Sequence, residues 1–138
     1  MKINVYTDGS SKKDRLGSCT AVIFSDNDFL GAITEASNFK GNDKAELKGV
    51  INGLEYILNN KLDRSDITIF TDYKKIVNVY YNRHSEKNII YKEQPLWERL
   101  FELSGKLHFN IKLVKGHQKI FNPNKTCDIL ARLRLYKS

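Results

Sequence analysis

Two segments of the sequence repeat one short pattern. Val5-Tyr6-Thr7-Asp8 and Ile69-Phe70-Thr71-Asp72 are both hydrophobic runs that end in Thr-Asp, which is typical of a β-strand that stops at the aspartate. If the two strands are parallel neighbours, Asp8 and Asp72 meet at the sheet edge where α/β folds bind ligands. Each aspartate taken singly is more simply a cap of the following turn or helix. The repetition favours a shared site.

A third carboxylate lies on the clearest predicted helix, residues 43–60. Its apolar residues recur at three- and four-residue spacing: Leu47, Val50, Ile51, Leu54, Ile57 and Leu58. At helical geometry Glu46 lies about 40° from Val50, at the margin of the apolar face, and should point toward the sheet. The alternative is a capping box in which Asp43 caps the helix and Glu46 folds back onto it. Asp128, beside Ile129 and Leu130, is a fourth candidate, although helix starts attract acidic residues in any case.

The remaining patterns predict the order of the elements. Strands are expected at 3–7, 18–25, 29–37, 66–71 and 107–114, and helices at 43–60, 73–81, 93–104 and from Asn122-Pro123 onward. Asp26-Asn27-Asp28 indicates a hairpin between the second and third strands. The third helix should stop at Gly105. The order is β-β-β-α-β-α-α-β-α.

Length and composition narrow the class of protein. A chain of 138 residues suits one domain, residues 1–138, and 41% hydrophobic with 28% charged residues excludes disorder as the main state. The net charge of +7 favours a polyanionic partner without identifying it. No apolar run approaches the about 20 residues of a membrane helix, and no signal peptide is evident. Cys19 and Cys127 lack metal-site spacing and are expected to be reduced thiols, which predicts a cytoplasmic protein. A monomer is expected.

Five motifs occur in one order along the chain. They are Thr7-Asp8-Gly9-Ser10, Asn42 with Ala45-Glu46-Leu47, Thr71-Asp72, Val114-Lys115-Gly116-His117 and Cys127-Asp128-Ile129-Leu130-Ala131. With these motifs and the element order, nearly the whole chain resembles a type 1 ribonuclease H. The resemblance implies the α/β ribonuclease H-like fold. In that fold a five-stranded mixed sheet, three antiparallel strands followed by two parallel ones, has helices on both faces.

The resemblance also implies an activity, which is Mg²⁺-dependent cleavage of the RNA strand of RNA/DNA hybrids with 5′-phosphate products. Asp8, Glu46, Asp72 and Asp128 match the essential carboxylates that bind two Mg²⁺ ions, with Mn²⁺ as a possible substitute. Converging carboxylates repel one another unless cations neutralise them, and Mg²⁺ prefers oxygen ligands. Two such ions about 3.5 to 4 Å apart can activate water and stabilise the leaving oxygen. His117 matches a loop histidine that helps to move a proton or expel product.

Further positions match contacts to the nucleic acid. Gly9, Ser10 and Asn42 are implied to face the 2′-hydroxyls that distinguish RNA from DNA, Asn124 is implied as another contact, and Lys115 is implied to contact phosphate. All of these residue types are also common in turns, caps and solvated surface. His84 and His108 match no motif and are interpreted as surface or packing residues.

The sequence departs from the family pattern beside the site. Tyr73 stands where the family usually has Ser, and Asp43 where a second Asn is frequent. The turn at 11–15 is short and charged. The stretch 82–92 has basic residues but no Trp, whereas cellular members often have a Trp-bearing basic protrusion that grips the DNA strand.

Other functions remain open at this point. One is a module that binds RNA/DNA hybrids or double strands with weak or lost catalysis, which the intact carboxylates argue against. Another is a nuclease or transposase of the same fold, although transposase-type sites generally take their Glu from a late helix. The plainest is a basic α/β domain with capping acids.

Overall fold

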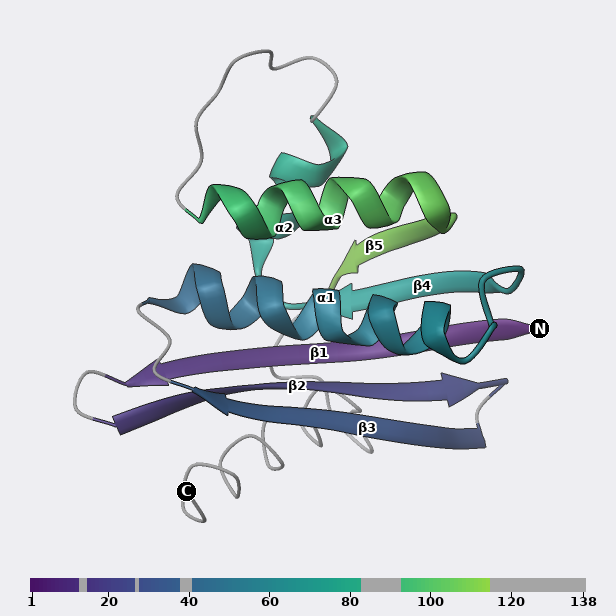
Figure 1. Ribbon diagram of the computed structural model, residues 1–138, viewed down its shortest axis with the longest axis horizontal. Helices are drawn as coiled ribbons and strands as arrows, with labels where there is room; N and C mark the ends of the chain where they lie inside the picture. Colours follow the sequence, from purple (N-terminus) through teal and green to yellow (C-terminus); the bar gives the residue numbers. More distant parts are fainter. Residues whose placement is uncertain (13–14, 27, 38–40, 83–92, 115–138) are drawn as a thin grey trace.

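The computed structural model describes residues 1–12, 15–26, 28–37, 41–82 and 93–114, and its centre is a five-stranded mixed sheet (Figure 1). The strands are β1 (Lys2–Lys12), β2 (Arg15–Ser25), β3 (Asp28–Ser37), β4 (Asp66–Thr71) and β5 (Phe109–Leu113). The first three pair antiparallel, β4 pairs parallel with β1, and β5 pairs parallel with β4. The spatial order β3-β2-β1-β4-β5 confirms the predicted sheet.

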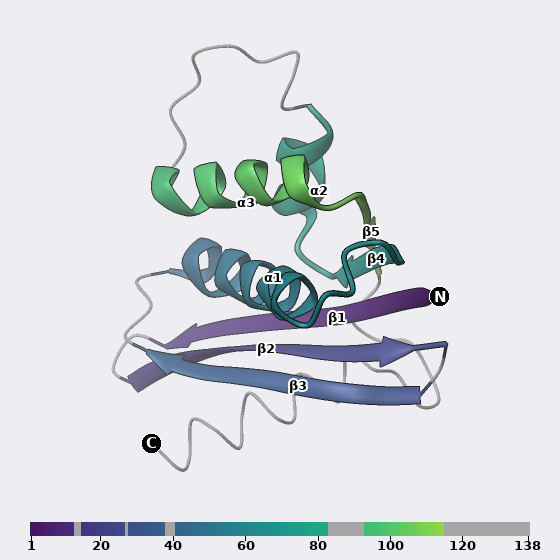
Figure 2. The ribbon, with the colours of Figure 1, turned by 45° about the vertical axis from the view of Figure 1, so that its right-hand side comes forward.

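Within the described ranges, three helices pack with this sheet around one core. They are α1 (Asn42–Asn59), α2 (Lys74–Tyr81) and α3 (Gln94–Lys106). Helix α1 lies along β1 and β2, and α3 packs on α1 (Figure 2), where Arg99 Nε lies 3.1 Å from Glu55 Oε1. The helix predicted from Asn122 onward, and with it the expected cover of the second face of the sheet, lies outside the described residues. No helix in the described ranges is long and apolar enough to cross a membrane.

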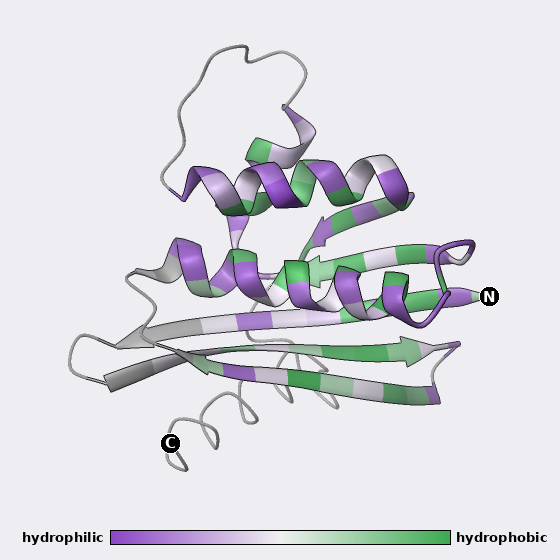
Figure 3. Cartoon of the chain, viewed as in Figure 1, coloured by the Kyte–Doolittle hydropathy of each residue, from purple (hydrophilic) through white to green (hydrophobic). Residues whose placement is uncertain are grey.

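The core follows from the alternation of side chains along the central strands. In β1 and β4 the buried side chains alternate with more exposed ones and are apolar up to the threonine before each aspartate, while each helix turns an apolar side toward them (Figure 3). Burying each of these large aliphatic side chains contributes roughly 1.5–3 kcal/mol. The fully buried residues from the two layers include Ile3, Val5, Ile67, Ile69, Leu47, Leu54, Ile76, Trp97 and Leu100.

Small residues let α1 approach β1 closely. A Cβ atom on Gly9 would lie 2.6 Å from the carbonyl carbon of Ala45, and one on Gly53 would lie 2.8 Å from Cγ1 of Val5. Neither position has room for a side chain unless the helix moves away from the strand. This close contact brings the first turns of α1 next to the middle of β1.

The ends of β1 and α3 differ from the prediction, each for its own reason. Strand β1 does not end at Asp8 but continues to Lys12, since β2 pairs with it at Asp8↔Thr20 and Gly9↔Cys19. Helix α3 does not end at Gly105 but includes it and Lys106, and the Leu107 amide still donates to the Leu103 carbonyl at 2.9 Å.

Candidate metal and catalytic site

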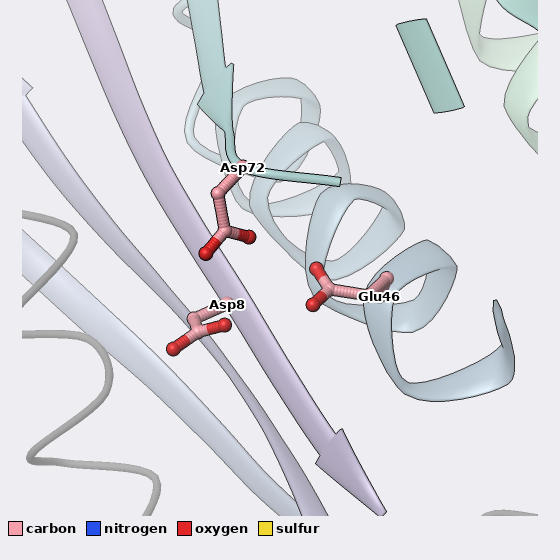
Figure 4. A group of neighbouring side chains, drawn as sticks. All are labelled: Asp8, Glu46 and Asp72. Carbon is pink, nitrogen blue, oxygen red and sulfur yellow. The ribbon is translucent and has the colours of Figure 1, made fainter. Parts of the chain in front are cut away.

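Three carboxylates from three elements converge at one place. Asp8 projects from β1, Asp72 follows the last residue of β4, and Glu46 lies in the second turn of α1 (Figure 4). One carboxylate oxygen from each lies within 4.8 Å of the others. Of the three residues, Glu46 is buried, Asp8 is partly exposed and Asp72 is exposed. The cluster is therefore anchored in the protein on one side and open to solvent on the other.

The sheet register explains why the two aspartates meet. The parallel pairing of β1 with β4 begins at Lys2↔Asp66 and runs to Tyr6↔Phe70, and two residues further along each chain stand Asp8 and Asp72. Each aspartate is six residues beyond the start of the pairing. The repeated Thr-Asp pattern is thus in register, as predicted for parallel neighbours.

The threonines of this pattern hold the backbone around the cluster. The Thr7 hydroxyl donates to the Phe70 carbonyl at 3.3 Å and ties β1 to β4. The Thr71 hydroxyl accepts a hydrogen bond of 3.1 Å from the Tyr73 amide, which turns the chain immediately after Asp72. Both threonines are fully buried. They orient the backbone from which the aspartates project.

Glu46 points toward the sheet and is only 5% exposed, as the helical spacing predicted. The capping-box alternative is wrong, because the N-cap of α1 is Gly41 and makes no side-chain capping hydrogen bond. Burial raises the pKa of the Glu46 carboxyl well above its usual range, and the charges of Asp8 and Asp72 raise it further, while a hydrogen bond with the Gly9 backbone acts in the opposite direction.

The buried Oε2 atom of Glu46 has no hydrogen-bond partner among the described residues. A buried polar atom without a partner requires an explanation, and a cation held between Glu46, Asp8 and Asp72 supplies one. Carboxylate oxygens are the ligands that hard divalent ions prefer, and such an ion would also relieve the repulsion among the three charges. The residues therefore fit a divalent metal ion.

The other predicted residues fall in three groups. Gly9 adjoins Asp8, and its amide donates to Asp8 Oδ1 at 2.9 Å. Ser10 belongs to β1 opposite Ser18, and Asn42 is the first residue of α1. The last group, Lys115, His117, Asn124 and Asp128, lies outside the described residues.

The sequence reasoning noted Tyr73 and Asp43 only as departures from a family pattern and missed that they touch. The Tyr73 hydroxyl donates to Asp43 Oδ1, and Lys75 Nζ lies 2.5 Å from Asp43 Oδ2. The available signal was that both unusual residues adjoin predicted metal ligands: Tyr73 follows Asp72, and Asp43 precedes Glu46 by three residues.

The fold and the site together define a class. A mixed sheet that carries a solvent-open cluster of carboxylates, on a chain with net charge +7, suits a metal-dependent enzyme whose substrate carries phosphate groups. A model of the RNase H family matches residues 1–135, and the chain belongs to this family. This confirms the resemblance inferred from the motifs and classes the chain as a ribonuclease H enzyme.

Two curated relatives are named Ribonuclease H. The chain is 28% identical over 143 residues to the Ribonuclease H of Thermoanaerobacter sp. (strain X514), covering 94% of this chain and 86% of the relative. It is 27% identical over 141 residues, with the same coverage, to the Ribonuclease H of Nitratidesulfovibrio vulgaris (strain DP4).

Solved structures support the fold. RNase H1 from Halobacterium salinarum NRC-1 superposes with a TM-score of 0.79 at 19% identity, covering all of both chains. LC11-RNase H1, solved in complex with an RNA/DNA hybrid, gives a TM-score of 0.79 at 16% identity, covering 98% of this chain and 97% of the other. At these identities the likeness concerns the architecture.

Proposed function

We propose that this protein is an endonuclease that hydrolyses the RNA strand of RNA/DNA hybrids and leaves 5′ phosphates. The observation that carries the proposal is the cluster of Asp8, Glu46 and Asp72 within 4.8 Å, in which a buried Glu46 oxygen lacks a partner. Membership of the RNase H family and the name of the curated relatives support the reaction. The hybrid bound to LC11-RNase H1 supports the substrate.

Asp8, Glu46 and Asp72, with Asp128 as the fourth predicted ligand, would hold two Mg²⁺ ions, with Mn²⁺ as a substitute. Held by these residues, the ions would supply Lewis-acid chemistry, which would lower the pKa of the attacking water and stabilise the leaving oxygen. The chain's own part is to hold the oxygens in place: the Gly9 amide orients Asp8, and the packing of α1 on β1 fixes Glu46. His117 is proposed as the group that moves a proton or helps product leave.

Binding of the hybrid is proposed to use backbone and side-chain groups next to the carboxylates. Gly9, Ser10 and Asn42 would contact the 2′-hydroxyls and Asn124 would make a further contact to the nucleic acid. Lys115 would contact phosphate, so that affinity falls with added salt. We further propose that residues 1–138 act as one domain, as a monomer and in the cytoplasm, where the buried free thiol of Cys19 stays reduced.

The test offers end-labelled RNA/DNA hybrid, RNA duplex, DNA duplex and single strands to the purified protein, with Mg²⁺, with Mn²⁺ and with a chelator. The expected result is cleavage of RNA in the hybrid that requires metal. Asp72→Asn should lower the cleavage rate more than about a hundredfold. Removing a residue that only orients a metal ligand costs about 10- to 100-fold in activity, and removing the ligand itself should cost more. Asp63→Asn is the matched control, because Asp63 is an exposed aspartate in the turn before β4.

Two results would overturn the proposal. Full activity of Asp72→Asn would show that the carboxylate cluster is not required for catalysis. Tight, salt-sensitive binding of the hybrid without cleavage in either metal would instead favour a binding module.

A further inference from the structure

Tyr73, Asp43 and Lys75 form a group that we call the Asp43 clamp. The Tyr73 hydroxyl donates to one carboxylate oxygen of Asp43, and Lys75 Nζ lies 2.5 Å from the other. Asp43 is in the first turn of α1, whereas Tyr73 and Lys75 belong to the segment that leaves β4 and enters α2. The clamp therefore joins two elements that are 30 residues apart in the sequence.

The clamp residues adjoin two of the three carboxylates in the sequence. Tyr73 directly follows Asp72, and Asp43 precedes Glu46 by three residues, close to one turn of helix. The clamp thus connects the backbone that carries Asp72 to the helix that carries Glu46. Any change in the separation of these two elements changes the distance between the carboxylate groups.

The clamp is built to hold its geometry. The Asp43 side chain is only 12% exposed, and both of its oxygens are engaged. The Tyr73 ring packs against the main core, and its amide is bound to the Thr71 hydroxyl at 3.1 Å. Tyr73 is therefore restrained at both its backbone and its hydroxyl, which limits the positions open to Asp72.

The clamp also opposes a specific force. When Glu46 is ionised and no cation is bound, the three clustered carboxylates repel one another, and this repulsion acts to separate α1 from the end of β4. The Tyr73–Asp43 bond resists that separation, while the Lys75 ammonium balances the charge of Asp43. Both Tyr73 and Asp43 are departures from the family pattern, and the structure places the two unusual side chains in contact.

We propose that Tyr73, held by Asp43, is a positioning residue that keeps Glu46 and Asp72 at the separation needed to bind the divalent cation. The inference rests on the proposed function, because it assigns the cluster to metal binding. Residues that orient metal ligands typically change metal affinity by 10- to 100-fold when they are removed. The clamp should act on metal affinity more than on the rate at saturating metal.

The experiment compares Tyr73→Phe, Asp43→Asn and the double variant with the unchanged chain. Binding of Mn²⁺ is measured without substrate, and hybrid cleavage is measured across a Mg²⁺ titration. Tyr56→Phe is the control, because Tyr56 is a half-buried tyrosine of α1 ten residues beyond Glu46. Thermal unfolding of each variant is recorded alongside.

We expect Tyr73→Phe to raise the Mn²⁺ dissociation constant and the half-saturating Mg²⁺ concentration about tenfold, while cleavage at saturating Mg²⁺ stays within about twofold. The double variant should be no weaker than the worse single variant, because both substitutions remove the same bond. Tyr56→Phe should titrate like the unchanged chain.

Two results would overturn the inference. One is a Tyr73→Phe variant with unchanged metal titrations. The other is a Tyr73→Phe variant that cleaves more slowly at every Mg²⁺ concentration and unfolds at a lower temperature, but binds Mn²⁺ with unchanged affinity. That combination would indicate a purely structural role. Failure of the proposed function would be visible elsewhere, as absence of hybrid cleavage by the unchanged chain in either metal.

Discussion

Replacing Glu46 with glutamine should make the metal-free protein more stable at neutral pH and abolish its metal-dependent activity. The substitution keeps the size of the side chain and removes a charge that is buried beside Asp8 and Asp72. The glutamine amide can also donate hydrogen bonds to those two carboxylates, which a carboxylate cannot do.

Two independent limits set the size of the expected gain in the free energy of unfolding. The three oxygens lie within 4.8 Å of one another, and two unit charges at that limit repel by about 0.9 kcal/mol in water and about 3.5 kcal/mol at an effective dielectric constant near 20. Since Asp72 is exposed and Asp8 only partly buried, the water-like value is the better guide for each pair. Glu46 can also take up a proton, which removes its charge. The destabilisation by Glu46 therefore cannot exceed about 1.4 kcal/mol for each pH unit above the ordinary pKa of the carboxyl. We expect a gain of about 2 kcal/mol at pH 7, or roughly 5–10 °C in melting temperature.

The sign of the pH dependence follows from the raised pKa. Because the pKa of Glu46 is higher in the folded than in the unfolded chain, the native state keeps a proton that the unfolded state has lost. The free energy of unfolding of the metal-free protein should therefore fall as pH rises from about the ordinary value of 4.5 through the raised folded value. In Glu46→Gln this contribution to the slope should be missing.

The assay is urea unfolding in chelator between pH 4 and pH 8, followed by circular dichroism. The stability difference between Glu46→Gln and the unchanged chain should be near zero at pH 4, where the glutamic acid is protonated and resembles glutamine, and should grow with pH. Glu98→Gln, at an exposed position on α3, is the control. A Glu46→Gln chain that is less stable at every pH, or a difference that does not depend on pH, would refute the reasoning.

Three further substitutions test the packing around the site, each by chemical denaturation. Gly9→Ala should destabilise the fold by about 1–3 kcal/mol and lower activity, because its Cβ would lie 2.6 Å from the Ala45 backbone; unchanged stability would contradict the close contact of β1 with α1. Gly105→Ala should instead stabilise by up to about 1 kcal/mol, since nothing lies within 4 Å of its Cβ inside a helix, and a loss of stability would contradict the helical assignment. Tyr81→Phe should cost about 1–2 kcal/mol, because the Tyr81 hydroxyl donates to the Ile111 carbonyl and accepts from the Ile111 amide, both at 2.9 Å; a cost equal to that of Tyr56→Phe would argue against this edge contact.

Much of the site could be predicted because its information is local. The Thr-Asp repeat has the same distance from strand start to aspartate in β1 and β4, so parallel pairing alone brings Asp8 to Asp72. Glu46 was predictable because helical spacing fixes which face of α1 it occupies. In both cases the regular geometry of a strand or helix determines where the carboxylate lies, so the residue pattern within that element is sufficient to predict it.

The predictions failed where local turn and stop signals did not decide the boundary. Asp8-Gly9-Ser10 has turn chemistry, but hydrogen bonds to β2 extend the strand through it to Lys12. Glycine is a common helix stop, yet α3 continues through Gly105 to Lys106, and the Leu107 amide closes its last turn on the Leu103 carbonyl. Local propensities are worth about 1 kcal/mol or less per residue, so a few tertiary contacts outweigh them.

By itself the sequence determined the order of the elements from β1 to β5, the family and three converging carboxylates. Only the tertiary structure decided that Glu46 keeps a buried oxygen without a partner and that Tyr73 bonds to Asp43. Burial and contacts between elements depend on how helices and strands pack. No local sequence pattern predicts a contact between two side chains 30 residues apart, because the pattern around each residue is independent of the other residue.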